Sequence, residues 1–528
     1  MTGTGWTRDA IAAAHPTFFH HARTLRHRYG PGPWPDSGDP LPDAGPTDTG
    51  TSTSTGTRTS TRTGLGFVGG GEDALLRPDP APHGTAPPTA AELAGHLAHL
   101  LPTAPPGLGG EAFTRLHELL ATCSPIDLAD DLSAEIRRRG LPSDGLRLLG
   151  RQLARHGTHR APVKIGLVLL GLGGDTRDRD LLLLLGSLDE LTLYAAVALH
   201  RSQPDGDRAV HALARRVAGW GRIQAVRTLR DTPDPRIKAW LLREGFRNTI
   251  TDEYLAHLAA TTGDLHRALG RPHVDTPLLN GGGRILAAMA EGQGGPAPGL
   301  ADYAHAVPVL RRYADLVQAR TPTLARLRDL IAITLFFRHP PGELPWPPAD
   351  ITSLTARYED LLHASHWRTL VHDHLADPHR PDFHLALRPA EVLHLDATAP
   401  LLARLETGPS LLDPAWFRAL GSADRRHAAH LLDLAERRLA TTPRPERDHA
   451  LLVLAHLLRR HPEHGWPLLR SALTDSTPEV RRTALSTLAA WPAHTLTPEA
   501  ADLLLQRPEM GLGAVSGPGR TGRPGDPP

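Results

Sequence analysis

A cluster of histidines is the feature of this sequence that comes nearest to a metal site. The cluster consists of His363, His366, His372, His374, His379 and His384. His363 and His366 are three residues apart on a predicted helix, a spacing that lets two imidazoles share one metal ion. No carboxylate completes a His-Glu-x-x-His pattern, and the chain has 31 histidines, so clusters arise by chance. We therefore predict solvated or capping histidines and no bound metal.

Glycine-rich segments and potential nucleophiles were the next candidates for chemistry. The triple glycines Gly69–Gly71 and Gly281–Gly283 lack the Gly-Lys-Ser/Thr ending that holds phosphate and magnesium in nucleotide-binding loops. No Gly-x-Ser-x-Gly segment is present. Cys123 is the only cysteine and follows an apolar helical pattern, which disfavours a thiol nucleophile. The sequence thus predicts no cofactor and no enzymatic activity.

Tryptophan and arginine gather in the middle of the chain, where they could anchor a binding partner. The residues concerned are Trp220, Arg222, Arg227, Trp240, Arg243 and Arg247. Gly219 and Gly221 flank Trp220, which suits a tight turn between two helices. Trp and Arg are the usual anchors of protein-binding surfaces. Two interpretations stay open: these residues line a concave binding face, or the tryptophans pack between helices while the arginines form ion pairs at turns.

The elements that must position these residues are helices. From residue 111 onward, apolar residues recur at helical spacing, and Pro, Gly or Asp interrupts the pattern after each helix length. In the segment 125–139, Ser124 and Pro125 begin the helix, and a run of arginines followed by Gly140 ends it. Further helices are predicted at 143–156, 161–172, 177–186, 189–200, 205–218, 220–230, 234–245, 250–261, 300–319 and 323–338, with a Gly/Pro break at 270–283. Short links favour antiparallel neighbours, and no segment shows the alternation of a strand.

A repeat signature lies near the C-terminus, in the segment from Leu473 to Leu488. Its apolar positions on one helix face are Val480, Ala484 and Leu488. Arg481 lies beside that face, within reach of Asp475 across the preceding turn. The segment resembles the second helix of a HEAT repeat, in which a turn Asp, a Pro, a Val and an Arg recur in this order.

A looser copy of the signature follows Asp231. Its matching positions are Pro235, Ile237, Lys238 and Leu241, while the turn Asp is displaced by one residue. The surrounding segment, 164–265, resembles a group of uncharacterised bacterial helical-repeat proteins, which implies a fold and no activity. HEAT repeats of about 40 residues would fit roughly nine or ten times between residues 111 and 506. The resemblance implies an all-α chain, a right-handed α-solenoid of antiparallel helix pairs of the HEAT/ARM type.

Composition divides the chain into four predicted parts. These are 1–110, short helices on flexible Pro/Gly/Thr-rich chain; 111–345, HEAT-like helical repeats; 349–506, a second block of such repeats; and 507–528, a disordered tail. A Pro-rich connector around Trp346 separates the two repeat blocks. Because the N-terminal linker and the tail have little to bury, we expect them to stay disordered.

Charge and apolar content limit the partners and the compartment. The chain has 58 basic and 57 acidic residues, a net charge of +1, which argues against bulk attraction to nucleic acid or an anionic membrane. The longest apolar stretch, 181–199, contains Asp189 and Glu190, which disfavour a membrane span. The N-terminus lacks a basic start and an apolar core, so no secretory signal is expected. We predict a cytoplasmic location and no membrane contact.

These observations lead to a non-enzymatic protein-interaction scaffold as the predicted function. Solenoids offer long concave surfaces to a protein or peptide partner. The alternative is a HEAT-like DNA-binding protein or DNA glycosylase with Trp220, Trp240 and Arg222 in its cleft, although no position matches that family's catalytic Asp. A metal-dependent hydrolase that uses the histidine cluster is a third, weaker reading. A basic groove would favour nucleic acid, and a mixed or apolar groove would favour protein.

Overall fold

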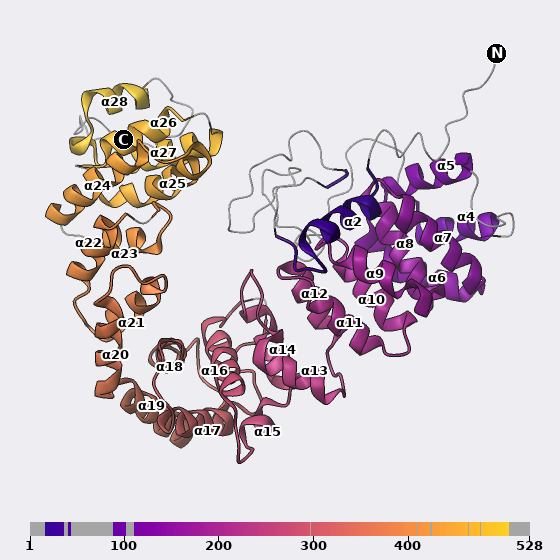
Figure 1. Ribbon diagram of the computed structural model, residues 1–528, viewed down its shortest axis with the longest axis horizontal. Coiled ribbons are helices and arrows are strands. Elements are labelled where there is room, and N and C mark those ends of the chain that lie inside the picture. The colour runs from indigo at the N-terminus through magenta and orange to yellow at the C-terminus, as the bar shows by residue number, and fades with distance from the viewer. Residues whose placement is uncertain are drawn as a thin grey trace, which may run out of the picture. The chain divides into compact units, whose positions relative to one another are not determined.

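The chain is helical throughout the part that the structure describes. The computed structural model describes residues 16–35, 41–43, 88–101, 110–295, 297–408, 410–422, 425–462, 464–475 and 477–505. Within these ranges it forms α-helices, short 3-10 segments and one π segment, and no β-strand (Figure 1). The all-α prediction is therefore confirmed. The predicted disordered tail and most of the predicted N-terminal linker lie outside the described residues.

Two compact units make up the chain, Met1–Ala364 and Ser365–Pro528. The helices of the first unit are α2 (Phe18–Tyr29), α4 (Ala90–Leu100), α5 (Gly110–Ala121), α6 (Pro125–Arg139), α7 (Ser143–His156), α8 (Arg160–Gly173), η2 (Thr176–Asp178), α9 (Arg179–Gly186), α10 (Thr192–Ser202), α11 (Gly206–Ala214), α12 (Trp220–Thr228), α13 (Pro235–Trp240), η3 (Leu241–Gly245), α14 (Glu253–Thr262), α15 (Leu265–Leu269), α16 (Thr276–Glu291), α17 (Ala306–Gln318), α18 (Leu324–Arg338) and α19 (Pro348–Leu362).

The second unit contains shorter helices. They are α20 (Ser365–Leu375), η4 (Phe383–Ala386), α21 (Leu387–Val392), α22 (Thr398–Glu406), α23 (Pro414–Ser422), α24 (Arg425–Leu439), α25 (Arg444–Leu457), η5 (Leu458–Arg460), α26 (Trp466–Leu473), α27 (Pro478–Ala489), η6 (Ala493–Thr495) and α28 (Pro498–Leu505). Helix α27 carries the predicted repeat signature, and its Val480, Ala484 and Leu488 are buried as expected. Arg481 does reach Asp475, but its guanidinium donates to the backbone carbonyl, at 2.7 Å, rather than to the carboxylate.

Local signals explain the helix ends that were predicted well. Helix α6 begins at Pro125, whose fixed φ suits the first turn, and ends before Gly140 in the left-handed conformation at φ 63°. Ser124 occupies the N-cap position, yet its hydroxyl does not cap the backbone and instead donates to the Asp127 carboxylate at 2.7 Å. Helix α7 spans Ser143–His156, the predicted range.

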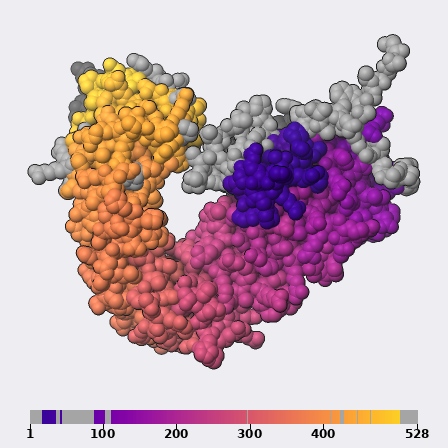
Figure 2. All heavy atoms as spheres, in the orientation of Figure 1, coloured from indigo at the N-terminus to yellow at the C-terminus, as the bar shows by residue number. Residues whose placement is uncertain are grey.

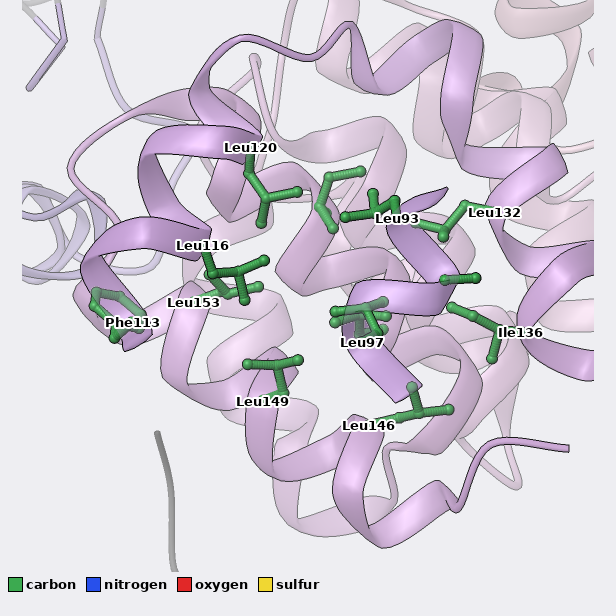
Figure 3. Close-up of a cluster of buried hydrophobic side chains, with 13 residues drawn as sticks. Leu93, Leu97, Phe113, Leu116, Leu120, Leu132, Ile136, Leu146, Leu149 and Leu153 are labelled. Carbon is green, nitrogen blue, oxygen red and sulfur yellow. The ribbon is translucent and has the colours of Figure 1, made fainter. Parts of the chain in front are cut away.

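A leucine-rich core joins α4, α5, α6, α7 and α8. Figure 3 shows the side chains that meet there, including Leu93, Leu97, Phe113, Leu116, Leu120, Leu132, Ile136, Leu146, Leu149 and Leu153, none more than 4% exposed. Each helix contributes residues three or four positions apart, which places them on one face. Burial of a leucine of this kind stabilises the fold by about 2 kcal/mol.

The triple glycine Gly281–Gly283 lies inside α16, so the predicted break at 270–283 is wrong for its second half. The glycines allow neighbouring helices to approach α16 closely. A Cβ at Gly281 would lie 2.0 Å from the Leu242 carbonyl oxygen, and one at Gly283 would lie 2.1 Å from the Tyr313 hydroxyl. The conformational cost of glycine in a helix, about 1 kcal/mol each, is offset by this close packing.

An ion-pair ladder links successive helix pairs of the first unit. Its carboxylates are N-cap residues: Asp178 of α9, Asp205 of α11, Asp234 of α13, Asp264 of α15 and Asp275 of α16. Their partners, in the same order, are Arg147, Arg179, Arg208, Lys238 and Arg243, at nitrogen-to-oxygen distances between 2.6 and 2.8 Å. Each cation lies on an earlier helix, so each rung joins one helix pair to the next.

The ladder has a regular spacing over its middle rungs. In Arg179–Asp205, Arg208–Asp234 and Lys238–Asp264 the partners are 26 residues apart. The three aspartates follow one another at intervals of about 30 residues, shorter than the predicted unit of about 40. Lys238, predicted to be the counterpart of Arg481, reaches forward to the next helix pair. Hydrogen bonds from the arginines hold the pKa of Asp205 and Asp234 below the usual value.

The division between the units falls after α19, later than the predicted connector at 346–348. Aromatic contacts tie the connector and α19 back to α18: Trp346 packs against Phe336 and Phe337, and Tyr358 of α19 packs against Phe337. The Tyr358 hydroxyl also donates to the Leu310 carbonyl oxygen, at 3.0 Å. These contacts place residues 346–362 with the first unit.

Candidate functional site

The predicted tryptophan and arginine residues lie on α12, α13, η3 and the turn that follows. Trp220 begins α12 and is only 4% exposed, with its ring centroid 5.0 Å from that of Tyr254 on α14. The Arg227 guanidinium lies over the same Tyr254 ring, 5.8 Å from its centroid. Trp220, Arg227 and Tyr254 therefore form one aromatic–cation group between α12 and α14.

A second group surrounds Trp240. The Arg222 guanidinium lies 5.2 Å from the centroid of the Trp240 ring, and the His211 ring meets Trp240 edge-on at 4.5 Å. Nε and Nη1 of Arg222 and Nε2 of His211 are buried without a hydrogen-bond partner among the described residues. Burial lowers the pKa of both side chains, with Arg215 the next contribution for His211. The indole face therefore takes the place of hydrogen-bond acceptors around Arg222.

The two remaining predicted residues are held separately. Arg243 is a rung of the ladder through Asp275, and Arg247 lies 5.6 Å from the ring centroid of its neighbour Phe246. The structure thus brings the six predicted residues into one stretch of helices, but each makes an internal contact. That they bind a partner stays a prediction.

The histidine cluster does not converge on one point in the described residues. His374 is buried, and its Nε2 lies 3.2 Å from the Asp382 carboxylate, while His363 lies 3.6 Å from Glu359. No group of three or more His, Cys, Asp or Glu side chains suited to a metal ion occurs in that part of the chain. The Cys123 thiol is half-buried and lies 3.5 Å from the Leu119 carbonyl oxygen, and burial raises its pKa.

A groove in the second unit is the largest cavity that we consider. It has a volume of about 810 Å³ and lies between α21, α22, α23 and the end of α25 with η5. A smaller cavity of about 330 Å³ adjoins it and shares Leu387, Phe417 and Arg418. We call the two together the Phe417 groove. Volumes of this size are typical of ligand sites and can accept several side chains of a peptide.

The groove combines an apolar floor with an excess of positive charge. Leu387 and Leu401 are buried at its base, and Phe417 is 44% exposed, one of few large apolar side chains so exposed in the described residues. The charged residues of its lining are Arg388, Arg418, Arg459 and Arg460 against Glu391 and Asp396. An apolar patch bordered by charge marks an interaction surface more often than a random one.

The charges of the groove are unequally paired. Burial opposes ionisation of Glu391, but Arg388 and Arg418 outweigh burial and lower its pKa. Asp396 accepts from the Thr398 backbone N–H at 2.9 Å. Arg459 and Arg460 have no carboxylate partner among the described residues, and Arg460 makes only a 3.5 Å contact with a backbone carbonyl oxygen. These two guanidinium groups remain open to an acidic ligand.

Sequence reasoning missed the groove because its residues come from separated segments. The one local signal was the adjacent pair Trp416 and Phe417 on α23, of which only the first can face the core. Trp416 is fully buried, so Phe417 is turned outward. A pair of neighbouring aromatics on an amphipathic helix therefore deserved a place among the candidates.

Comparisons with known proteins give no relative on which a function could be based. No protein-family model matches the chain, and no curated protein and no solved structure matches it. None of the helices in the described ranges is both long and apolar enough to cross a membrane.

Proposed function

We propose that this protein is a non-enzymatic scaffold that binds a protein partner in the Phe417 groove. The observation that carries the proposal is the exposed Phe417 between two joined cavities, with Arg459 and Arg460 left unpaired at the border. An aromatic anchor with neighbouring arginines is the composition of a binding hot spot.

The partner segment has a defined chemistry. The cavities accept apolar side chains beside Phe417, and the net positive border attracts carboxylates. The occupant of the groove is therefore a peptide segment in which apolar and acidic side chains alternate. Such a segment matches the mixed groove of a protein-binding surface better than the uniformly basic cleft that nucleic acid requires.

The arrangement of the first unit supports a scaffold of stacked helix pairs. The ladder joins consecutive pairs through N-cap aspartates, a contact between neighbours only, as in HEAT-like solenoids. We therefore extend the proposal to a HEAT-like, right-handed solenoid. The Trp220 and Trp240 groups with Arg222, Arg227, Arg243 and Arg247 are secondary candidates for partner contact in that solenoid.

Selection of displayed random peptides on the full-length chain tests the groove. Enriched peptides should combine acidic with aromatic or aliphatic residues, and they should bind Phe417→Ala at least about tenfold more weakly, the loss of about 1.4 kcal/mol expected for an aromatic anchor. Leu148→Ala is the matched control because Leu148 is 43% exposed on α7 and lies outside the groove. Peptides that bind Phe417→Ala as well as the unaltered chain, or that lack acidic residues, would exclude this site.

A further inference from the structure

Helix α2 presents a row of basic side chains beside a second cavity, in the first unit. The helix begins after Thr17, which accepts from the His20 backbone N–H, and buries Phe18, Ala22 and Leu25. It packs against α7 and α9, and Figure 2 shows its indigo atoms on the surface of this unit. Because helical positions three or four apart share a face, Phe19, Arg23 and Arg26 line the adjoining cavity together.

The cavity next to α2 has an apolar floor and cationic walls. Its volume is about 460 Å³, and we call it the α2 cavity. Leu181 of α9 lies at the floor, and Arg155 of α7 faces α2 from the other side. Guanidinium groups approach the Phe19 ring from two residues, Arg23 at 5.8 Å and Arg155 at 5.6 Å from the ring centroid. The aromatic ring thus helps to fix both arginines over the cavity.

The arginines of the α2 cavity lack the carboxylates that pair with arginines elsewhere in the unit. Arg23, Arg26 and Arg155 form no ion pair in the described part of the chain, and Asp180 is the one carboxylate among the described lining residues. Nearby Arg216 has a lowered pKa, first because of burial and second because of the charge on Arg26. Like charges that repel one another beside an apolar floor are stabilised when an anion binds between them.

Phosphate is the anion that these groups suit best. A phosphate monoester carries nearly two negative charges at pH 7 and three strong acceptor oxygens. Arginine guanidinium groups bind phosphate through two parallel N–H donors, a geometry that lysine cannot supply. The apolar floor formed by Leu181 adds a surface for a non-polar group, and the volume falls in the range of small-molecule sites.

We propose that the α2 cavity is a binding site for a small organic phosphate, with Arg23, Arg26 and Arg155 on the phosphate and the Leu181 floor under the organic group. The site lies in the first unit, far along the chain from the Phe417 groove, and it does not depend on the proposed scaffold function. It gives the protein a small-molecule input besides a protein partner.

Isothermal titration calorimetry of the full-length chain with phenyl phosphate tests the proposal, with inorganic phosphate as the second ligand. We expect phenyl phosphate to bind, and Arg23→Ala and Arg155→Ala each to weaken binding at least about tenfold. Arg155→Lys keeps the charge but loses the paired donors, so it should fall between the two. Arg201→Ala removes an exposed arginine of α10 outside the cavity and should bind like the unaltered chain.

The outcomes separate the parts of the proposal. Absence of phenyl phosphate binding at millimolar concentration, or equal binding by Arg155→Ala and Arg201→Ala, would overturn the site. Inorganic phosphate that binds as tightly as phenyl phosphate would overturn the role of the apolar floor. Circular dichroism of each variant verifies that a loss of binding is not a loss of fold.

Discussion

The ladder and the α2 cavity use the same residue type in opposite ways. Along the ladder, arginines such as Arg179 and Arg208 meet an N-cap aspartate of the next helix pair. In the α2 cavity, Arg23 and Arg155 meet an aromatic ring and no carboxylate in the described residues. Both regions lie in the first unit, so the difference concerns their partners and not the compactness of the fold.

This difference shows how an arginine-rich chain separates structural from ligand-binding cations. Arginine abundance alone carries no information, since the chain is nearly neutral. A cation whose charge is balanced within the fold contributes to cohesion, whereas an unbalanced one next to a cavity stores electrostatic repulsion that a ligand can relieve. Variants that remove a charge should therefore affect stability in the first region and binding in the second.

The largest effect is expected at a carboxyl that no cation reaches by hydrogen bond, Asp329 of α18. Burial raises its pKa to about 7, because the cations around it, Arg284 first, do not offset the loss of water. Since the unfolded carboxyl ionises near pH 4, stability is highest below that pH and falls as the pH rises through about 7. Asp329→Asn should remove this fall and be more stable at about pH 8 by about 4 kcal/mol.

Urea unfolding of both proteins between about pH 4 and pH 8 measures the Asp329 effect. The difference between the two free energies of unfolding is the informative quantity, because other groups contribute equally to both. A difference that does not change with pH would show that Asp329 is ionised in the folded state throughout, and that its surroundings resemble the ladder.

The next largest effect is expected at Asp178, the most buried rung of the ladder. Its carboxylate is fully buried and accepts from Arg147 at 2.6 Å and also from Arg151. Asp178→Ala leaves two guanidinium groups without their partner and should reduce the free energy of unfolding by about 3 kcal/mol. Chemical denaturation measures this, with Asp130→Ala, an exposed position of α6, as the control. A loss as small as that of the control would mean that the ladder does not hold the helix pairs together.

The smallest effect on stability is expected in the α2 cavity. Arg155→Ala removes an unpaired charge and should change the free energy of unfolding by no more than about 0.5 kcal/mol, since only its contact with Phe19 is lost. Thermal unfolding without added phosphate is the appropriate measurement. A loss comparable to that of Asp178→Ala would identify Arg155 as a structural residue and remove the contrast between the two regions.

Local sequence signals were sufficient for several helices and failed where close packing decided the outcome. Pro125 and Gly140 bound α6, and Val480 with Ala484 defines the buried face of α27, because caps and helical periodicity act within a few residues. Gly281–Gly283 was taken for a break, because glycine disfavours helices locally. The approach of Leu242 and Tyr313 to α16 outweighs that preference, and no local pattern reveals it.

The sequence by itself determined the helical class, most helix positions and the presence of N-cap aspartates, since these follow from propensity, periodicity and capping. Only the tertiary structure decided which cations those aspartates meet, because ladder partners such as Lys238 and Asp264 are 26 residues apart and their pairing depends on how helix pairs stack. The same holds for the α2 cavity, where Phe19 and Arg155 meet from separate helices, and for the groove beside Phe417. Charge balance at a site is a property of neighbours in space, which composition and spacing along the chain do not fix.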